Sequence, residues 1–327
     1  MAIKLVSMAP LNEAVLTAMM KGAGLSLQDE IEIVNVNSLP DDKIIEEVKY
    51  ADIILGDFTF NKKITREIAL AAGHARLIQQ PTVGYQHIDI DACTEAGIRV
   101  ANTAGANTIG VAEHTVMAGL CLMKKTVAAH LSTRAGEWKQ LEIGPGEIYG
   151  KTWGLVGMGR IGKAVAERLI PFGVRVLYHD AVRLSDDDES RYRAAMVTCD
   201  DLLKSSDIIS LHCPLTDETR GLISRERIAA MKPGALIINV ARGEIIDETA
   251  LAEALRDRQI GGAALDVYTE EPLKKDSPLL SVDANLLLTP HIAGATTESK
   301  IRIIGAAIGN IVKVLNGEKP DFIINNV

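Results

Sequence analysis

The sequence predicts an α/β protein built from two doubly wound parallel sheets. Short apolar segments typical of strands recur at regular intervals through the N-terminal third, and a second series begins near the middle of the chain. The segments between them carry the helical spacing of apolar residues. Because parallel strands need a crossover between them, usually a helix, this alternation favours parallel sheets that are covered on both faces.

The first series predicts five strands and the second predicts six, the number that a full dinucleotide-binding sheet needs. Their ranges are 3–8, 31–36, 52–57, 75–81 and 98–103, then 154–159, 174–179, 208–214, 235–241, 262–267 and 285–290. A long, largely apolar helix is expected over 111–130 and a further helix over 297–316. The acidic run that starts at Ser185 is expected to form a solvated loop.

The bulk composition is that of a globular protein with two domains. The chain has 327 residues, 47% of them hydrophobic and 24% charged, so each half can bury its own core. The net charge is −8 and no stripe of Lys and Arg is present, which argues against nucleic acid or an anionic membrane as the main partner. The N-terminus lacks a signal-peptide hydrophobic region, and no apolar run approaches the roughly 18 residues that span a bilayer. A cytoplasmic location is expected.

Neither a disulfide framework nor a metal site is predicted. The four cysteines are widely spaced and contain no C-x-x-C pair, so they are expected to be reduced thiols: Cys93, Cys121, Cys199 and Cys213. Five histidines lack the spacing of metal ligands and are expected to be surface or core residues: His74, His87, His114, His130 and His179. Tyr85 and Trp138 fit a substrate pocket and ordinary packing equally well.

The most specific motif is a glycine-rich turn in KTWGLVGMGRIG. Gly157, Gly159 and Gly162 have the G-x-G-x-x-G spacing that provides a tight turn, close approach to a pyrophosphate and close packing of helix on strand. The turn lies between a strand and a helix, and Asp180 closes the next strand, where a carboxylate binds the adenosine ribose. The motif therefore predicts bound NAD. Asp180 repels a 2′-phosphate, so NAD is favoured over NADP despite the nearby Arg183.

Three polar residues follow consecutive apolar strands of the second series. Arg242 comes after ALIINVA, Glu271 after GAALDV and His291 after NLLLTP, so all three are expected at one edge of the sheet. Oxidation of an alcohol needs a proton acceptor, and imidazole titrates near neutral pH. A carboxylate favours the imidazolium, and a guanidinium pairs with a substrate carboxylate. Each residue alone is more often structural, but the three together favour a catalytic site.

Several segments resemble the signatures of the D-isomer-specific 2-hydroxyacid dehydrogenase family. They are VARGEIIDETALAEAL, GAALDVYTEEP and TPHIAGAT, and the similarity extends over nearly the whole chain. The resemblance implies that Arg242 binds the substrate carboxylate and carbonyl oxygen, that His291 is the acid/base and that Glu271 pairs with it. It also implies a Rossmann NAD-binding domain at 103–295, inserted into a flavodoxin-like substrate domain formed by 1–102 and 296–327.

The resemblance implies further contacts beyond the catalytic residues. The cofactor contacts are Arg160 and Ile161 at the pyrophosphate, His212, Cys213, Pro214 and Thr216 beside the adenosine, Asp266 at the nicotinamide carboxamide, and Val240, Ala241, His291 and Gly294. The substrate contacts are Val83, Gly84 and Tyr85, in a loop whose backbone amides meet the substrate carboxylate, together with Arg242 and His291.

Departures from related patterns narrow the substrate. Gln80 stands where phosphoglycerate enzymes usually carry Arg, and Val83 stands where phosphite enzymes carry Lys. Glu271 is present, whereas formate enzymes lack it. A small or medium 2-keto acid with an uncharged tail is therefore expected. A 3-phosphoglycerate- or hydroxypyruvate-type dehydrogenase and an NAD(H)-sensing corepressor stay open as alternatives, and an alanine-dehydrogenase type of enzyme is disfavoured by the three signature segments.

The helix expected over 111–130 is more apolar than one exposed surface tolerates. The family resemblance implies that this region builds a symmetric dimer around the nucleotide domains. A homodimer is therefore expected.

Overall fold

The computed structural model describes residues 3–22 and 31–327. Contacts divide the chain into two compact units, of which the first comprises Met1–Asn107 with Thr297–Val327 and the second Thr108–Thr296. Both units are parallel-sheet α/β domains, which confirms the predicted fold class. Within the described ranges, no helix is long and apolar enough to cross a membrane.

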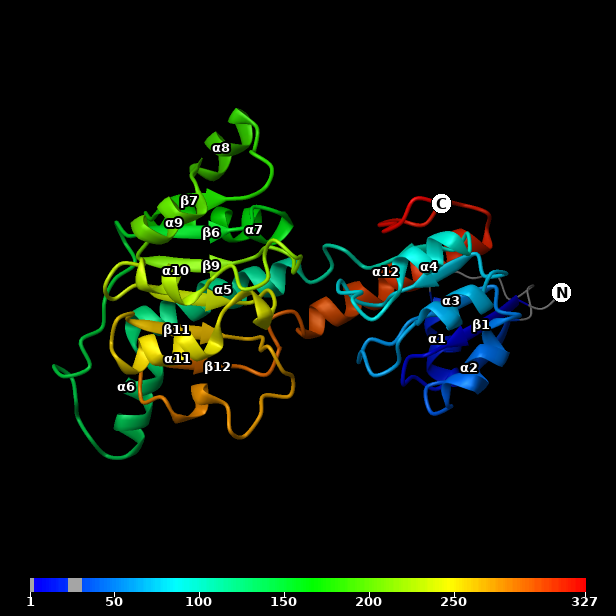
Figure 1. Cartoon of the computed structure of the whole chain (residues 1–327), viewed down its shortest axis with the longest axis horizontal. Helices are drawn as coiled ribbons and strands as arrows, with labels where there is room; N and C mark the ends of the chain where they lie inside the picture. Colours follow the sequence, from blue (N-terminus) through cyan, green and yellow to red (C-terminus); the bar gives the residue numbers. More distant parts are fainter. Residues whose placement is uncertain (1–2, 23–30) are drawn as a thin grey trace. The chain divides into compact units, whose positions relative to one another are not determined.

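The first unit contains a five-stranded sheet in the order β2-β1-β3-β4-β5, the flavodoxin-like order. Its strands are β1 Ile3–Ser7, β2 Ile31–Asn35, β3 Ile53–Leu55, β4 Leu77–Gln79 and β5 Arg99–Ala101. Its helices are α1 Glu13–Gly22, α2 Asp41–Val48, α3 Arg66–Ala71, α4 Ile90–Glu95 and α12 Thr297–Leu315. Buried side chains of α1 and α12 form one core cluster with the sheet, and those of α2, α3 and α4 form another. Figure 1 labels these helices around β1.

The C-terminal tail lies along β5, at the edge of this sheet. Ile323 forms an antiparallel bridge with Ala101. The side chain of Asn325 accepts a hydrogen bond from the amide of Val100 at 2.8 Å and donates one to the carbonyl of Ile98 at 2.8 Å. The tail therefore satisfies backbone groups that an edge strand leaves unpaired.

The second unit contains a seven-stranded sheet in the order β12-β11-β10-β9-β6-β7-β8. The strands are β6 Thr152–Val156, β7 Arg175–His179, β8 Ala194–Met196, β9 Ile208–Leu211, β10 Leu236–Asn239, β11 Gly262–Leu265 and β12 Leu286–Leu288. The helices are α5 Thr108–Lys124, α6 Thr126–Arg134, α7 Arg160–Leu169, α8 Asp186–Tyr192, α9 Cys199–Ser205, α10 Arg225–Ala229 and α11 Glu248–Arg256. Strand order reverses between β6 and β9, and ligands bind at such a switch point in open α/β sheets.

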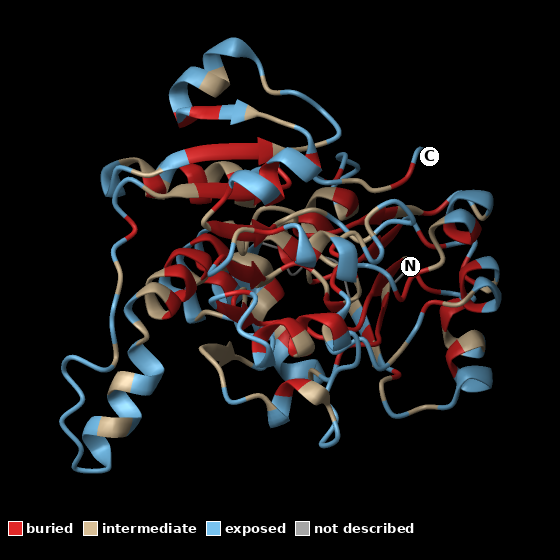
Figure 2. Ribbon diagram, turned by 60° about the vertical axis from the view of Figure 1, so that its left-hand side comes forward, coloured by how far each residue is buried: buried red, intermediate tan, exposed pale blue. Residues whose placement is uncertain are grey.

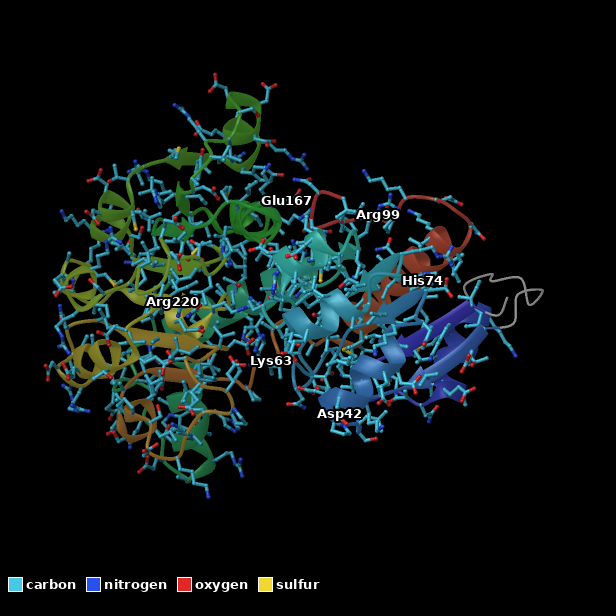
Figure 3. The ribbon with its side chains drawn as sticks, turned by 45° about the vertical axis from the view of Figure 1, so that its right-hand side comes forward. Asp42, Lys63, His74, Arg99, Glu167 and Arg220 are labelled. Atoms are coloured by element: carbon cyan, nitrogen blue, oxygen red, sulfur yellow. The ribbon has the colours of Figure 1, made fainter. Side chains whose placement is uncertain are left out.

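Both faces of this sheet are covered, and its strands are largely buried (Figure 2). Buried side chains of α5 and α7 form one core cluster with the sheet, and those of α9, α10 and α11 form the other. Charged residues of both signs are exposed on the two units, among them Asp42, Lys63, Glu167 and Arg220 (Figure 3).

Strand β8 was not among the six strands expected for this sheet. It has three residues, lies at the sheet edge and, among the described residues, pairs with β7 alone. An edge strand this short carries too little apolar alternation to be recognised by its pattern.

The single helix expected over 111–130 is in fact two helices. Helices α5 and α6 are separated by Lys125, whose φ of +50° is left-handed and ends the first helix. The apolar residues of α5 are largely buried within their own unit, and Gly119 packs directly against the ring of Trp153. Helix α6 has no buried residue (Figure 2). Burial in the core of its own unit thus explains most of the apolar character of α5.

The acidic run after Ser185 forms helix α8, which corrects the expected loop. The Ser185 side chain accepts a hydrogen bond from the amide of Asp188 at 3.2 Å and caps the helix. The acidic residues occupy its first turn, where they interact favourably with the positive end of the helix dipole.

Candidate active site

The glycine turn joins β6 to α7, and its geometry requires at least two of the three glycines. Gly157 has a φ of +99°, and a Cβ there would lie 2.6 Å from the amide nitrogen of Cys213. A Cβ on Gly162 would clash with the carbonyl oxygen of Gly157. Side chains at these two positions would therefore push the turn away from β9 or the helix away from the strand.

Gly159 differs from Gly157 and Gly162, because a Cβ there would meet no atom within 4 Å. It is the residue that caps α7, a helix of ten residues whose amide end can bind an anion. Arg160, which is exposed, and Ile161, which is half-buried, begin the helix. Open space at Gly159, bounded by two glycines that shape the turn, fits the pyrophosphate of a dinucleotide.

Asp180 follows β7 and is fixed beside this turn. Its Oδ2 accepts a hydrogen bond from the amide of Met158 at 2.6 Å, and its Oδ1 accepts one from the amide of Val182 at 3.1 Å. The carboxylate thus lies next to the glycine turn, as a ribose-binding acid requires. Arg183, the basic residue nearby, is hydrogen-bonded to Glu189.

His212, Cys213, Pro214 and Thr216 follow β9, which neighbours β6. The Nε2 of His212 lies 2.9 Å from the Ser210 hydroxyl, whereas its Nδ1 is buried without a hydrogen-bond partner among the described residues. Burial lowers the pKa of His212 to about 3, so the ring is neutral at physiological pH. A buried polar atom without a partner, next to the glycine turn, also fits a bound polar group.

His291 and Glu271 are directly hydrogen-bonded. The Nδ1 of His291 lies 2.7 Å from Oε2 of Glu271, and Oε1 of Glu271 accepts the amide of Tyr268 at 3.0 Å. Burial raises the pKa of Glu271, but these hydrogen bonds and the charges of His291 and Arg242 outweigh it, so its pKa lies below the usual value. Both side chains are partly exposed, at 47% for His291 and 37% for Glu271. The pair can therefore exchange protons with a ligand.

Arg242 follows β10 and is half-buried. Its guanidinium donates to the carbonyl of Ala241 at 2.6 Å, and its own carbonyl accepts the side-chain amide of Asn239 at 2.8 Å. Burial lowers the pKa of Arg242, and the charges of Glu271 and Glu244 act in the opposite direction. A partly desolvated guanidinium that keeps free donors is suited to binding an anion. Val240 and Ala241 precede it directly, half-buried and buried respectively.

Asp266, directly after β11, shapes the turn that carries His291. Its carboxylate accepts hydrogen bonds from the Thr289 hydroxyl at 2.6 Å and from the amides of Ile292 and Ala293 at 2.9 and 2.8 Å. Its carbonyl accepts the amide of His291 at 2.8 Å. Three hydrogen bonds within the chain therefore hold this carboxylate, which is almost completely buried. Gly294 follows this turn and is half-buried.

Sequence reasoning missed His114 as part of this site. Its Nε2 lies 3.4 Å from the Thr289 hydroxyl and 4.0 Å from Oδ1 of Asp266. Burial lowers the pKa of His114, and Asp266 offsets this in part. Tyr268 was also missed, although it donates its amide to Glu271 and its hydroxyl to the carbonyl of Thr289 at 2.9 Å. Neither residue has a local sequence signal, because only the fold brings them close to His291, Glu271 and Asp266.

The predicted substrate contacts Val83, Gly84 and Tyr85 lie in the first unit, in the loop after β4. The carbonyl of Val83 accepts the side-chain amide of Asn102 at 2.8 Å, and the carbonyl of Gly84 accepts the hydroxyl of Thr82 at 2.8 Å. These bonds fix the loop at the carboxyl edge of its sheet, while the side chain of Tyr85 is 39% exposed. Trp138, in the second unit, is 81% exposed and does not pack into a core.

Comparisons with known proteins identify the family of this chain. Residues 116–293 match the model of the D-isomer specific 2-hydroxyacid dehydrogenase NAD-binding domain. The chain is 40% identical over 312 residues to a glyoxylate reductase of Thermofilum pendens, which covers 92% of this chain and 91% of that enzyme. It is 42% identical over 256 residues to an (S)-sulfolactate dehydrogenase of Chromohalobacter salexigens, covering 77% of this chain and 82% of that one.

A solved structure shows the same fold over the whole chain. The glyoxylate reductase of Paecilomyes thermophila superimposes with a TM-score of 0.86 at 27% identity, covering 99% of this chain and 98% of that enzyme. The matched NAD-binding domain and these relatives establish NAD-dependent interconversion of 2-hydroxy and 2-keto acids. The chain belongs to the D-isomer-specific 2-hydroxyacid dehydrogenase family.

Proposed function

We propose that Arg242, Glu271 and His291 form the reaction centre, and that the substrates are small D-2-hydroxy acids and the corresponding 2-keto acids. The observation that carries this proposal is the 2.7 Å hydrogen bond between Nδ1 of His291 and Oε2 of Glu271. The bond engages Nδ1 and leaves Nε2 as the ring nitrogen for the substrate oxygen. An ionised Glu271 stabilises the imidazolium that forms when the ring takes up a proton.

The proton moves in opposite senses in the two directions of the reaction. During oxidation, the neutral ring of His291 accepts the proton of the substrate hydroxyl. During reduction, the protonated ring donates to the oxygen of the keto group. When bound at the glycine turn, NAD accepts the hydride and NADH donates it. Glu271, whose pKa lies below the usual carboxyl value, stays ionised throughout.

Arg242 binds and orients the substrate carboxylate. A guanidinium holds a carboxylate by two parallel hydrogen bonds, which fixes the carbon between the acid/base and the cofactor. Its positive charge also stabilises the oxygen on which negative charge develops. The half-buried setting supports this role, because electrostatic interactions strengthen as water is excluded.

We also propose that the loop of Val83, Gly84 and Tyr85, in the first unit, binds the substrate through its backbone amides. Near this loop, Gln80 is buried, and its Nε2 already donates to Thr82 at 2.7 Å and to the carbonyl of Asp57 at 3.3 Å. A neutral and engaged side chain offers no partner for a phosphate. This supports a 2-keto acid with a small uncharged tail, such as glyoxylate, the substrate named for the Thermofilum relative.

A second candidate is a 2-hydroxy acid with a sulfonate tail. It is supported by the 42% identity to the (S)-sulfolactate dehydrogenase of Chromohalobacter salexigens. The two candidates differ in the charge at the end of the substrate. The second one requires a cationic partner for the sulfonate.

The test is a panel of 2-keto acids assayed by NADH oxidation, with NADPH in parallel. The panel contains glyoxylate, pyruvate, hydroxypyruvate, 2-ketoisocaproate, phenylpyruvate and 3-sulfopyruvate. We expect the highest kcat/KM for a small uncharged keto acid with NADH. Preference for 3-sulfopyruvate supports the second candidate. Tight NADH binding with negligible turnover of the whole panel contradicts the proposal and supports an NAD(H)-sensing protein.

We also propose that the chain forms a homodimer through the surface of α6 and the segment after it. This surface carries large apolar side chains that are 40–89% exposed: Val127, Leu131, Trp138, Leu141 and Tyr149. Exposed apolar side chains gathered in one segment mark an interaction site. Light scattering should give twice the chain mass for the parent and the single-chain mass for Leu131→Asp. Val182→Asp, at a site 73% exposed elsewhere in the same unit, is the matched control. A monomeric parent protein contradicts this proposal.

A cytoplasmic location is proposed as well. All four cysteines are free thiols, and two of them, Cys93 and Cys199, are buried. Free thiols are typical of reducing compartments. Cell fractionation with an antibody against the chain tests the location, and recovery in an oxidising compartment contradicts it.

A further inference from the structure

The chain turns sharply directly after the ribose-binding acid. Oδ1 of Asp180 accepts the amide of Val182 at 3.1 Å, while Oδ2 is held by the amide of Met158 at 2.6 Å. Asp180 thus binds both the glycine turn, at Met158, and the turn that follows it, at Val182. Arg183 is the next residue after this second turn. In enzymes that use NADP, an Arg near the ribose acid pairs with the 2′-phosphate. Arg183 follows the acid, Asp180, by three residues.

In this protein Glu189 engages the guanidinium of Arg183. The Nε of Arg183 donates to Oε1 of Glu189 at 3.2 Å, and Nη2 donates to Oε2 at 3.0 Å. This is the two-bond geometry in which a guanidinium binds a carboxylate or a phosphate. The hydrogen bond from Arg183 also lowers the pKa of Glu189, so the carboxylate is ionised at neutral pH.

Glu189 is held in place by a second contact. The hydroxyl of Tyr178 donates to its Oε1 at 2.7 Å, and the same hydroxyl accepts the amide of Leu184 at 2.9 Å. Tyr178 is fully buried in β7, and the side chain of Glu189 is only 16% exposed, against 64% for Arg183. The carboxylate is thus a fixed partner, and the arginine is the exposed side chain that it captures.

We propose that Glu189 is a specificity-determining residue for the dinucleotide. By binding Arg183, it withholds a guanidinium that would otherwise pair with a 2′-phosphate. Selection of NAD then has two parts, an acid that repels the phosphate and a second acid that occupies the basic residue beside it. The inference rests on binding of the dinucleotide at the glycine turn.

The test uses an Asp180→Asn background, in which the direct repulsion is removed while a side-chain oxygen still accepts the amide of Met158. Dissociation constants of NADH and NADPH are measured on the purified protein by titration calorimetry. Adding Glu189→Gln should tighten NADPH binding about threefold to fivefold, the range that an exposed ion pair supports. NADH binding should change less than about twofold, since NADH carries no 2′-phosphate.

Three variants in the same background control this result. Arg183→Ala added to Glu189→Gln should abolish the gain in NADPH affinity, because the gain requires the freed guanidinium. Glu253→Gln should change neither affinity, although Glu253 also pairs with an exposed arginine, Arg225, in the same unit. Glu189→Asp keeps the charge but shortens the side chain that reaches Arg183, so it should raise NADPH affinity less than Glu189→Gln does. It replaces Glu189→Gln in the test if that variant does not fold.

Two outcomes overturn the inference. In the first, neither Glu189→Gln nor Glu189→Asp raises the affinity for NADPH, although thermal scans show that both variants are folded. The other is a loss of NADPH affinity when Arg183→Ala is added to Asp180→Asn alone, since Arg183 would then already reach the phosphate. Failure of the parent protein to bind NADH would instead contradict dinucleotide binding itself, so the two failures are distinguishable.

Discussion

Glu271 contacts two segments at once, because its Oε2 lies 2.7 Å from Nδ1 of His291 and its Oε1 accepts the amide of Tyr268. Glu271 and His291 are 20 positions apart in the sequence. One carboxylate thus orients the imidazole and is itself oriented by the backbone after β11. Such a fixed pair predicts separate effects on chemistry and on cofactor binding.

Replacing His291 with Ala should lower kcat about 10²- to 10⁴-fold, the range of general acid/base catalysis. The dissociation constant of NADH should stay within about threefold, since the glycine turn and Asp180 are unchanged. Steady-state assays and NADH titration give the two values. A parallel loss of both would show that His291 acts in cofactor binding and not as the acid/base.

Glu271→Gln should reduce keto-acid turnover. The side-chain oxygen of glutamine can still accept the amide of Tyr268, but the negative charge that stabilises the imidazolium formed during the reaction is lost. Steady-state measurement of kcat/KM tests this, and equal values for the variant and the parent protein are the contrary result.

Arg242→Lys keeps the charge but loses the two-bond geometry. We expect kcat/KM for the keto acid to fall about 10²-fold or more, because one point charge replaces a fork that holds and stabilises the substrate. NADH affinity is the internal control and should be unchanged. Turnover close to that of the parent would exclude a two-bond carboxylate contact.

Gly159 and Gly162 form a matched pair for the glycine turn. The methyl group of Gly159→Ala enters open space, so the variant should have the same unfolding temperature as the parent protein. It should bind NADH about tenfold more weakly or worse, because the methyl group occupies the space through which the pyrophosphate approaches the backbone. Gly162→Ala collides with the carbonyl of Gly157 and should lower both the unfolding temperature and NADH affinity. Thermal scans and NADH titrations separate the two, and equal loss of stability in both variants would contradict the assignment.

Stability should fall as the pH drops from 7.5 to 5. Burial lowers the pKa of His87, His114 and His212 in the folded protein, that of His212 to about 3. The pKa of a histidine in the unfolded chain is about 6.5. Below about pH 6.5 the unfolded chain thus binds protons that the folded chain does not, and the free energy of unfolding decreases with falling pH. His212 alone accounts for at most about 2 kcal/mol of this. Urea unfolding of the parent and of His212→Gln at both pH values checks the prediction, since the variant should lose less.

The parts of the structure that were predicted correctly depend on local physics. The glycine turn follows from backbone sterics, since the close approaches at Gly157 and Gly162 leave no room for a side chain. The strand pattern follows from burial on both sheet faces, which produces continuous apolar runs such as Leu236–Asn239. These features leave a pattern within a few consecutive residues.

The parts that were missed depend on distant contacts or on competing local signals. Lys125 adopts a left-handed conformation in a polar stretch that reads as helical, and it divides α5 from α6. Helix α8 did carry a signal, since Ser185 three residues before Asp188 is typical of a helix start, but the charge density of the run favoured a loop. His114 reaches Asp266 across a separation of more than a hundred residues, which no local pattern encodes.

The tail that lies along β5 has a consequence for how copies of this protein behave in solution. With Ile323 and Asn325 in place, the backbone of β5 is already paired and offers no template to a second chain. Removing these residues would expose a short, apolar edge strand, the kind of surface through which β-proteins aggregate. Ile323 and Asn325 thus protect the edge of this sheet from pairing with the sheet edge of a second copy.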